Sequence, residues 1–471
     1  MDRRDSQGED PSGVTQTDAP LDGHCEQTGW QSPANKPKAG DKMIHPLMPV
    51  RTIALLSLCA ALFGCASSQS PRRGTLPTGT AAGDMELSPF YRWTGTLPGR
   101  PGVMLKTEAM PSQPEITTAA SSQRILYTSD DARWKSGLLP VSGSLYLPSG
   151  AMPAGGWPVL AWAHGTVGAA DACAPSWQLH RPRDAFYINR WLEQGFAVVA
   201  TDYQGLGGPG PHPYQFWEAE GRSVLDSVRA ALAAHPGTLA NRVVISGQSQ
   251  GSGAAVGATR IAPTYAPDLQ LIATIATGVA PVFPDASYQP PAEVTTPGGP
   301  ARFTVLRLIG GSIPDGGPKP DDLMSDKGRR LLDIARTACV DEMRGTEQRE
   351  GINGDNAFTV PLAQLEARLL PTRDMSSVRL QTPLFLGTGL ADRTIVPRRQ
   401  YAAAAALCAA GTPLVWKAYD GITHNGIVNA AFNDELAFVR GAMAGSVQNS
   451  CQAHVEPGPV QRPTPGIRFN D

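Results

Sequence analysis

One serine in the sequence has the surroundings of a nucleophile. Ser249 lies in the stretch Gly247-Gln-Ser-Gln-Gly251, which has the pattern Gly-x-Ser-x-Gly. This pattern is typical of a sharp turn between a strand and a helix that holds the serine hydroxyl above a sheet. A strained backbone at the serine leaves no room for side chains two residues away, which explains both glycines. Because Gly accounts for 50 of the 471 residues, the bare pattern could arise by chance and needs partners elsewhere.

A serine hydroxyl becomes a nucleophile when a base takes its proton, and the base needs an acid to orient it. Behind such a turn, the acid and then the histidine follow in the chain. Asp392 comes just after the apolar segment 383–388, and His424 comes just after the apolar segment 413–419. Each therefore lies in a loop that follows a predicted strand. The sequence predicts a catalytic triad of Ser249, Asp392 and His424, with His424 as the general base.

Two other acids and several other histidines compete for these roles. Asp420 is four residues before His424 and is the alternative acid, whereas Asp202 ends an earlier strand and is predicted to brace its own loop. Four further histidines lie in polar or Pro-rich stretches that do not follow a strand. We expect these four to be solvated loop residues: His180, His212, His235 and His454.

The negative charge that develops on the substrate oxygen needs two backbone N–H donors. The N–H of Gln250 directly follows the nucleophile at the N-terminus of a predicted helix, where the helix dipole adds to the attraction. The second donor is expected in the loop after the apolar segment 157–163, and we assign it to Thr166 of His164-Gly-Thr166. Gly165 lets the backbone turn inward. His164 is predicted to hydrogen-bond its own loop and not to react.

The elements around these residues predict an α/β fold with a mostly parallel sheet. Two early segments, 124–128 and 141–147, are expected to be leading antiparallel strands. After them, apolar segments typical of buried strands alternate with helical patterns, as in a parallel sheet with helices on both faces. The buried strands are expected at 157–163, 196–201, 243–245, 269–276, 383–388 and 413–419, and the clearest intervening helices at 184–194 and 218–234.

This alternation stops between residues 281 and 378. The segment has a Pro/Gly-rich beginning and then helical patterns, clearest at 303–309, 328–340 and 362–370. We expect such an insertion to form a helical cap, or lid, over the carboxyl edge of the sheet, with an ordinary surface elaboration as the alternative. The core is therefore predicted in two parts, 89–280 and 379–450, followed by a C-terminal tail, 451–471.

The N-terminal part of the chain does not have the composition of a folded domain. Residues 1–47 are polar and poor in aliphatic side chains, so we expect them to be disordered or, if translation starts later, not made.

Residues 48–65 have a cation followed by an apolar run, which is typical of an export signal and too short for a membrane-spanning helix. The run ends in Leu62-Phe-Gly-Cys65, which resembles a bacterial lipobox. Cys65 is therefore the candidate lipidation site, with plain secretion as the alternative. Residues 66–88 are expected to form a flexible tether.

The other cysteines suit an exported protein. Cys173, Cys339, Cys408 and Cys451 form an even set after Cys65, and in an oxidising compartment such a set predicts two disulfide bonds. Three pairings are possible. We favour Cys173–Cys339 and Cys408–Cys451, because the second would fix the tail to the last helix; the alternative is four free buried thiols. Their spacing does not suit a zinc site.

The charge of the chain argues against a nucleic-acid partner. Lys and Arg total 40 and Asp and Glu total 42, so the formal net charge is −2. The sequence has no basic stripe of the kind that nucleic acids bind. Charged residues make up only 17% of the chain, and Gly and Pro number 50 and 43. This composition favours a loop-rich globular enzyme.

Taken in order, these motifs resemble those of the α/β-hydrolases and, within them, the secretory lipase family known from fungi and from bacterial relatives. The resemblance is carried by His164-Gly-Thr166, Cys173-Ala-Pro-Ser176, the segment from Asp202 to Gly207, Ser249, the segment from Gly389 to Pro397, and His424. It covers about residues 89–445 and implies an α/β-hydrolase fold, hydrolysis of carboxylic esters, a lid domain, and no metal or other cofactor. The chain departs from the family at Gln248, where Tyr or His is more usual, and in a cap that is only loosely similar.

The sequence therefore predicts a secreted or lipid-anchored lipase or esterase that works through a Ser-Asp-His triad and an acyl-enzyme. Its partner would be a small-molecule or lipid ester. It would act in the periplasm, at the outer membrane as a lipoprotein, or outside the cell. Two other classes stay open, namely a serine peptidase or acyltransferase with the same triad, and a noncatalytic binding lipoprotein.

Overall fold

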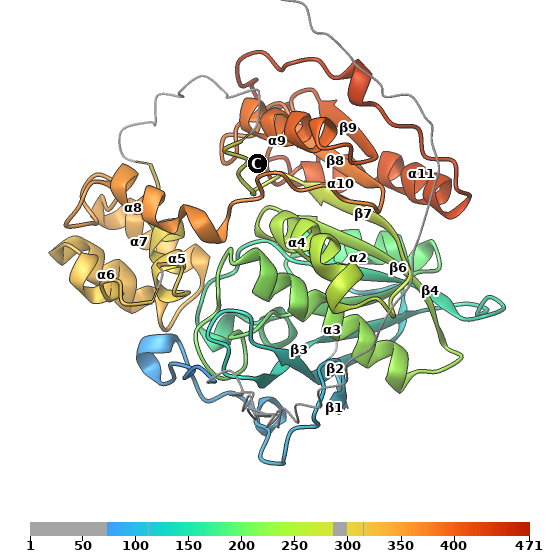
Figure 1. Ribbon diagram of the computed structural model, residues 1–471, viewed down its shortest axis with the longest axis horizontal. Helices are drawn as coiled ribbons and strands as arrows, with labels where there is room; N and C mark the ends of the chain where they lie inside the picture. The colour runs from blue at the N-terminus through green and yellow to red at the C-terminus, as the bar shows by residue number, and fades with distance from the viewer. Residues whose placement is uncertain (1–72, 112, 286–298, 314) are drawn as a thin grey trace, which may run out of the picture. The chain divides into compact units, whose positions relative to one another are not determined.

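The fold is built on one mixed β-sheet. The computed structural model describes residues 73–471 apart from residues 112, 286–298 and 314. Within these residues a nine-stranded sheet has the order β1-β2-β3-β5-β4-β6-β7-β8-β9 (Figure 1). The strands are β1 Met104–Ala109, β2 Ala119–Asp130, β3 Leu138–Pro148, β4 Trp157–Ala163, β5 Ala197–Thr201, β6 Leu239–Gln248, β7 Leu271–Thr277, β8 Leu384–Gly389 and β9 Leu414–Tyr419.

The sheet is antiparallel at its beginning and parallel over the rest. Strands β1, β2, β3 and β5 pair antiparallel, and β5, β4, β6, β7, β8 and β9 pair parallel. The mostly parallel sheet predicted from the sequence is therefore confirmed. Strand β1 was not predicted, because its sequence is Met-Leu-Lys-Thr-Glu-Ala and its side chains are half-buried or exposed, so it lacks the apolar pattern of a buried strand.

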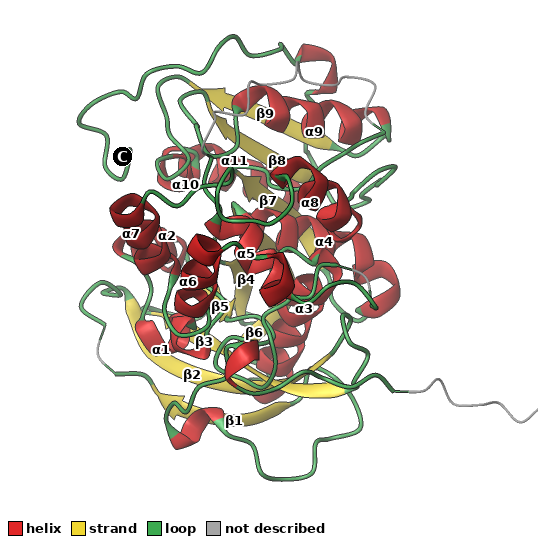
Figure 2. Ribbon diagram, turned by 90° about the vertical axis from the view of Figure 1, so that its left-hand side faces the viewer, coloured by secondary structure: helices red, strands yellow, loops and turns green. Residues whose placement is uncertain are grey.

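Helices cover both faces of the sheet, because neighbouring residues of a strand point to opposite sides. On β4, Val159 and Ala161 pack in a cluster with α3 and α4, whereas Leu160 and Trp162 pack in a second cluster with α2 and α11. Figure 2 shows α2 and α10 on one side of the central strands and α3 and α4 on the other. The flanking helices are α1 Pro175–Gln178, α2 Pro182–Glu193, α3 Trp217–Ala234, α4 Gln250–Tyr265, α9 Pro397–Ala409, α10 Ile427–Ala430 and α11 Phe432–Met443.

The four α-helices described between β7 and β8 have a hydrophobic core of their own. They are α5 Arg302–Ile309, α6 Asp326–Ala335, α7 Val340–Glu350 and α8 Leu362–Leu369, and Figure 1 shows them gathered together. Their shared core contains the buried side chains Val305, Leu331, Met343 and Leu365. The helix expected at 328–340 has the wrong end: α6 stops at Ala335, because the chain after it turns toward the loop after β4, and α7, which begins at Val340, was not predicted. There the N–H of Val340 donates to the carbonyl of Val167 at 2.8 Å.

The segment before β1 differs from the expected tether. Residues 66–72 lie outside the described residues, as do residues 1–65 with the expected signal and Cys65. Residues 73–88 contact the core: the N–H of Gly210 donates to Asp84 at 2.9 Å, and the N–H of Met85 donates to Asp171 at 2.8 Å. Ala82 is buried. The structured region therefore begins before residue 89, because backbone donors and carboxylates hold a segment whose composition alone predicts flexibility.

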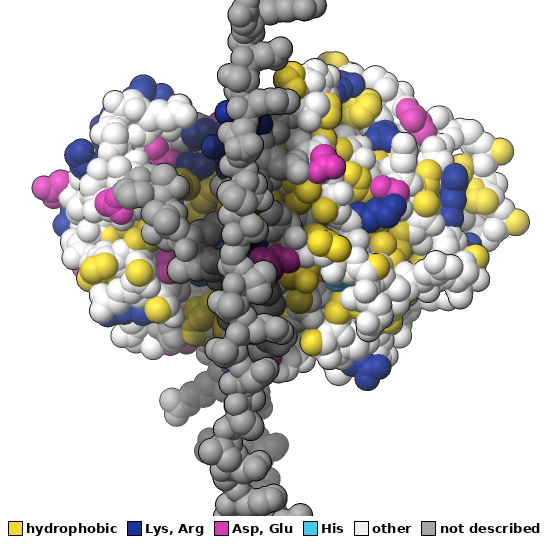
Figure 3. Space-filling model, turned by 90° about the horizontal axis from the view of Figure 1, so that it is seen from above, with side chains coloured by type: hydrophobic (Ala, Val, Ile, Leu, Met, Phe, Trp, Pro, Cys, Tyr) yellow, Lys and Arg dark blue, Asp and Glu magenta, His cyan; other side chains and the backbone are white. Residues whose placement is uncertain are grey.

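The described surface carries charges of both signs. On the face seen in Figure 3, Lys and Arg side chains are scattered among Asp, Glu and hydrophobic side chains, which agrees with the net charge of −2. Among the described residues, no helix combines the length and the apolar character that crossing a bilayer requires.

Candidate active site

Ser249 lies at the junction of β6 and α4 in a strained backbone conformation. Its φ of 57° and ψ of −119° fall outside the regions that residues with a side chain readily adopt. A Cβ atom at Gly247 would lie 1.9 Å from the carbonyl oxygen of Gly251, and one at Gly251 would lie 1.9 Å from the carbonyl oxygen of Ala163. Both positions therefore require Gly. Ser249 is half-buried whereas residues 248 and 250 are buried, so at this turn the serine is the more accessible residue.

Asp392 and His424 form a hydrogen-bonded pair. Nδ1 of His424 lies 2.7 Å from Oδ2 of Asp392, and the Asp392 side chain is 0% exposed against 12% for His424. Three further donors fix the carboxylate: the N–H groups of Thr394 and Ile395 and the amide of Gln400, each at 2.8 Å. A carboxylate can only accept a hydrogen bond, so Nδ1 of His424 is the donor and carries the proton. Nε2 is then the nitrogen that can act as the base.

The imidazole of His424 lies at the carboxyl ends of β6 and β7. The side-chain amide of Gln248 donates to the backbone carbonyl of His424 at 3.0 Å. Gly278 follows β7, and a Cβ atom there would lie 2.9 Å from Cε1 of His424. The N–H of Ser249 donates to the carbonyl of Thr277 at 2.9 Å. The strained turn around Ser249, called the elbow below, and the loop of His424 thus lie together at the carboxyl ends of the strands. The contacts between them are made by residues next to Ser249.

The two alternative acids have other partners. Asp420 is exposed and accepts from the amide of Gln461 at 2.8 Å. Asp202 is buried and accepts from the hydroxyl of Ser142 at 2.6 Å and from the N–H of Ser176 at 2.9 Å, as expected of a residue that braces its loop. Burial raises the pKa of Asp202 to about 6, against the opposing effect of these hydrogen bonds.

The loop after β4 lies against the elbow. A Cβ atom at Gly165 would lie 2.7 Å from Oε1 of Gln248, so a larger residue there would require the Gln248 side chain to shift. The hydroxyl of Thr166 hydrogen-bonds that of Tyr214 at 2.7 Å. Gln250 begins α4, so its backbone N–H is among those that a helix leaves free at its N-terminus. Nδ1 of His164 contacts the carbonyl of Gly165 at 2.7 Å, and burial lowers the pKa of His164, which suits a structural role.

A buried hydrogen-bond network beneath the elbow was not predicted from the sequence. The side-chain amide of Gln250 donates to Nε2 of His212 and to Oε1 of Glu220, both at 2.7 Å. The other nitrogen of His212, Nδ1, contacts the carbonyl of Gln204 at 2.9 Å, so its neutral form satisfies both contacts. Burial lowers the pKa of His212 to about 3 and raises that of Glu220 well above its usual value.

The prediction that four histidines are solvated is wrong for two of them. His180 and His212 are 6% and 0% exposed, respectively. The Pro-rich segment around His212 was expected to lie on the surface, but it packs between the loop after β5 and the end of α5. Cβ atoms placed at Gly205 or Gly310 would lie 2.4 Å from the N atom and 2.7 Å from the O atom of His212, respectively. No periodic pattern marks such a segment, so its burial could not be foreseen.

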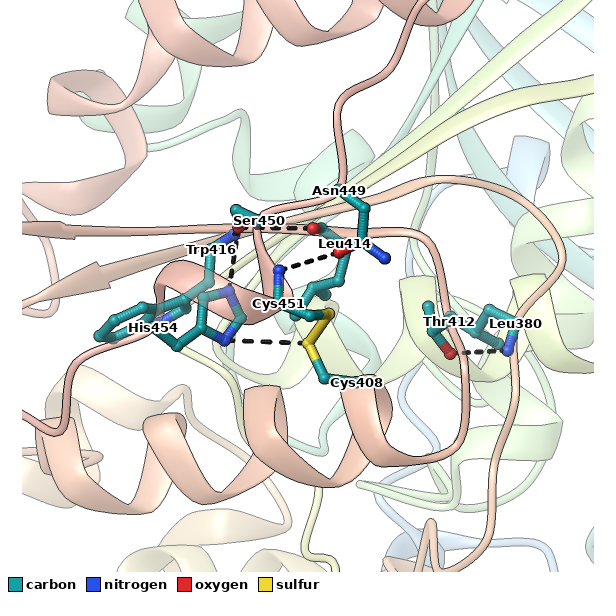
Figure 4. Close-up of a disulfide and its surroundings, with 9 residues drawn as sticks. All are labelled: Leu380, Cys408, Thr412, Leu414, Trp416, Asn449, Ser450, Cys451 and His454. Atoms are coloured by element: carbon teal, nitrogen blue, oxygen red, sulfur yellow. Dashed lines mark hydrogen bonds between the residues drawn. A yellow bond between two sulfur atoms is a disulfide. The ribbon is translucent and has the colours of Figure 1, made fainter.

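Both favoured disulfide bonds are present. Cys173–Cys339 joins the region after β4 to the start of α7. Cys408–Cys451 joins the last turn of α9 to the first residue of the tail (Figure 4). Beside the second bond, Nε2 of His454 contacts the hydroxyl of Ser450 at 2.9 Å. Two disulfides are typical of proteins that fold in an oxidising compartment.

Comparison with known families finds similarity to lipases over one segment. The sequence profile of the Secretory lipase family matches residues 178–285, which contain the Ser249 elbow. Lipase 7 of Candida albicans is 31% identical over 111 residues, which is 21% of this chain and 25% of the relative. Lipase A of Arthroderma benhamiae is 32% identical over 132 residues, which is 25% of this chain and 27% of the relative. The matches thus span about a quarter of the length of these curated relatives.

Comparison with solved structures extends the similarity to most of the described chain. Candida antarctica lipase A superposes with a TM-score of 0.59 at 19% identity, covering 78% of this chain and 86% of that one. The rice cell wall degrading esterase LipA from Xanthomonas oryzae superposes with a TM-score of 0.54 at 17% identity, covering 75% of this chain and 99% of that one. The chain has the α/β-hydrolase fold that the sequence predicted.

Proposed function

We propose that the protein is a serine hydrolase that cleaves carboxylic esters, with Ser249 as nucleophile, His424 as general base and Asp392 as the acid that orients it. The observation that carries this proposal is the 2.7 Å contact between His424 and Asp392 at the sheet edge where a strained turn presents Ser249. An acid, an imidazole and a hydroxyl in this order are what acyl transfer requires. The similarity to the Secretory lipase family around the elbow supports the same activity.

The first half of the reaction forms an acyl-enzyme. Oγ of Ser249 attacks the ester carbonyl carbon while Nε2 of His424 takes the hydroxyl proton, and the carbonyl electrons move onto oxygen. The backbone N–H groups of Gln250 and Thr166 stabilise that oxyanion. The tetrahedral intermediate then collapses, the bond to the alcohol oxygen breaks, and His424 donates the proton to the leaving alcohol.

The second half releases the acid. Water attacks the acyl-enzyme carbonyl while His424 accepts one of its protons, and a second oxyanion forms in the same place. The collapse of this intermediate breaks the bond to Ser249, and the proton returns to Oγ. The imidazole becomes a cation twice in each cycle, and the buried carboxylate of Asp392 stabilises that cation both times.

We further propose that α5 to α8, within residues 281–378, form a cap through which the ester enters. The core of these helices is separate from that of the sheet, and the bond Cys173–Cys339 ties α7 to the loop region that follows Thr166. A cap in this position would shape the acyl site and exclude water from it.

The test is hydrolysis of p-nitrophenyl esters, from acetyl to palmitoyl, by the purified protein and by the variant Ser249→Ala. We expect turnover by the unchanged protein and none above background by the variant. Faster cleavage of aminoacyl anilides than of esters would favour a peptidase, and acyl transfer to added alcohols in place of hydrolysis would favour an acyltransferase. Equal ester turnover by both proteins would contradict the proposed site. No turnover by either would favour the binding lipoprotein.

We also propose that the protein is exported and that Cys65 is lipidated. The two disulfide bonds and the similarity to a Secretory lipase family support export. The lipobox-like sequence before Cys65 supports a lipid anchor. Metabolic labelling with a clickable fatty acid tests this point, with label expected on the unchanged chain and lost in Cys65→Ser. Equal labelling of both chains would contradict the anchor.

A further inference from the structure

The tail, residues 451–471, has no role in the proposed mechanism, yet it contacts the loops that carry Asp392 and His424. Apart from the short turn Cys451–Ala453, the structure gives the tail no helix or strand. Its path is therefore set by individual hydrogen bonds, salt bridges, ring contacts and a disulfide. Several of these contacts fall on residues that come just before the acid and the base in the chain.

Gln461 connects the loop that carries Asp392, the acid loop, with the loop that carries His424, the base loop. Its backbone N–H donates to the carbonyl of Leu390 at 2.8 Å, two residues before Asp392. Its side-chain oxygen accepts from the N–H of Gly421 at 2.7 Å, three residues before His424. Its side-chain nitrogen donates to Asp420 at 2.8 Å. One residue of the tail thus satisfies backbone groups of both loops.

Asn470 contacts the residue next to the base. Its Oδ1 accepts from the N–H of Thr423 at 2.7 Å, and Thr423 directly precedes His424. Its Nδ2 donates to the carbonyl of Gly421 at 2.9 Å. A Cβ atom at Gly426 would lie 2.3 Å from Oδ1 of Asn470. The base loop therefore has Gly where the tail side chain enters, and it is bound by Asn470 on both sides of Ile422.

The tail is fastened to the core at both ends. At its start, the disulfide Cys408–Cys451 joins it to α9, and the guanidinium of Arg398 donates to the carbonyl of Pro457 at 3.1 Å. Near residue 470, the ring of Phe469 packs 6.0 Å from that of Phe186 on α2, and the guanidinium of Arg468 lies 4.2 Å over the same ring. A segment held at both ends can keep Gln461 and Asn470 in place.

We propose that the tail positions the acid–base pair, with Gln461 and Asn470 as positioning residues that hold the loop of His424 against the loop of Asp392. This inference rests on the proposed function. Without the tail, the backbone groups of Gly421, Thr423 and Leu390 would bond to water, and the imidazole would lose its fixed approach to Ser249. A misplacement of about 1 Å is enough to cost about a hundredfold in rate.

The test compares Gln461→Ala, Asn470→Ala and the double variant with Gln452→Ala, an exposed glutamine of the same tail. The readouts are kcat and KM for a p-nitrophenyl ester, the rate at which a fluorophosphonate labels Ser249, and the midpoint of thermal unfolding. We expect the double variant to lose about 10- to 100-fold in kcat and in labelling rate with KM within about threefold. Gln452→Ala should match the unchanged protein. Asn470→Asp keeps the acceptor for Thr423 and should retain more activity than Asn470→Ala.

A second variant tests the same contact from the other side. In Gly426→Ala, the new methyl group would displace Asn470, so kcat should fall about as far as in Asn470→Ala. Combining the two changes should cost little more than either alone, because the displaced oxygen is then absent. Folded variants with undiminished kcat and labelling would overturn the inference alone. Absence of hydrolysis and labelling in the unchanged protein would overturn the proposed function and this inference with it.

Discussion

The nucleophile and the acid–base pair of the candidate site are held by different kinds of structure. Ser249 lies between β6 and α4, two regular elements packed in the centre of the molecule. Asp392 and His424 lie in loops after β8 and β9, the last two strands in the order of the sheet. Hydrogen bonds from residues outside these loops hold them, among them nearby Gln400 and the distant Gln461 and Asn470.

The position of the serine is thus determined by local sequence, and that of the imidazole by residues far away in the chain. The position of the serine follows from a few consecutive residues, because strand, turn and helix are adjacent in the chain. The position of the imidazole depends on residues that are far from it in sequence, such as Asn470, which is 47 residues from the Thr423 that it contacts. Changes on the two sides should therefore have different consequences for turnover.

The largest effect should come from the elbow itself. Ser249→Ala removes the nucleophile, and we expect turnover of a p-nitrophenyl ester to fall about a million-fold, by analogy with other triads. The fold should be unaffected, because the substitution removes one oxygen from a half-buried residue. Ser149→Ala changes an exposed serine on another loop and should retain full turnover. A Ser249→Ala protein that stays folded and keeps turning over would show that the chemistry resides elsewhere.

The next largest effect should come from the acid, and a comparison of two variants tests which carboxylate orients His424. Asp392→Asn keeps the shape of the side chain but presents the imidazole with a group that cannot stabilise its cation, and we expect turnover to fall about ten-thousand-fold. Asp420→Asn alters the exposed alternative acid and should cost less than about tenfold, since Asp420 contacts Gln461 and not the imidazole. If Asp420→Asn has the greater cost, the assignment of the acid is reversed.

The two sides of the site also differ in how far the sequence predicted them. The elbow, the alternation of strands and helices from β4 onward and the general places of Asp392 and His424 follow from apolar runs and short motifs. The network of Gln250, His212 and Glu220 did not, because a Pro-rich segment gives no sign of burial and a lone Glu in a helix resembles a solvated one. Helix α7 was also missed, because its sequence Val-Asp-Glu-Met-Arg-Gly-Thr-Glu-Gln-Arg-Glu is mostly polar and gives little sign of a buried face. In each case the deciding contact is with a residue far away in the chain.

A smaller effect should follow from releasing the tail at its start. In the paired variant Cys408→Ser with Cys451→Ser, Gln461 and Asn470 remain but the tail loses its covalent anchor. We expect kcat to fall about tenfold with little change in KM, and the free energy of unfolding to fall by about 3 kcal/mol. The matched control is Cys173→Ser with Cys339→Ser, which frees α7 and should act mainly on KM, because α7 belongs to the proposed cap. An effect on KM in the first pair and on kcat in the second would reverse the roles assigned to the tail and the cap.

The smallest effect on turnover is expected under the elbow, where Glu220 can be replaced by its neutral counterpart. Burial raises the pKa of Glu220 well above its usual value of 4.5, so above pH 4.5 the folded protein binds a proton that the unfolded chain has lost. The stabilisation from this group is therefore complete below pH 4.5, and it falls as the pH rises toward the folded pKa, by up to about 1.4 kcal/mol per pH unit.

In Glu220→Gln, the side-chain oxygen can still accept from the N–H of Gln215 and from Gln250, but the side chain no longer titrates. Denaturant unfolding between pH 4 and 9 should give this variant a flatter profile and the greater relative stability at high pH, with turnover at neutral pH within a few-fold of the unchanged protein. Glu218→Gln alters an exposed carboxylate on the same helix and should leave the slope unaltered. Parallel profiles for Glu220→Gln and the unchanged protein would mean that Glu220 stays ionised in the fold, and the elbow would then rest on a buried charge and not on a neutral network.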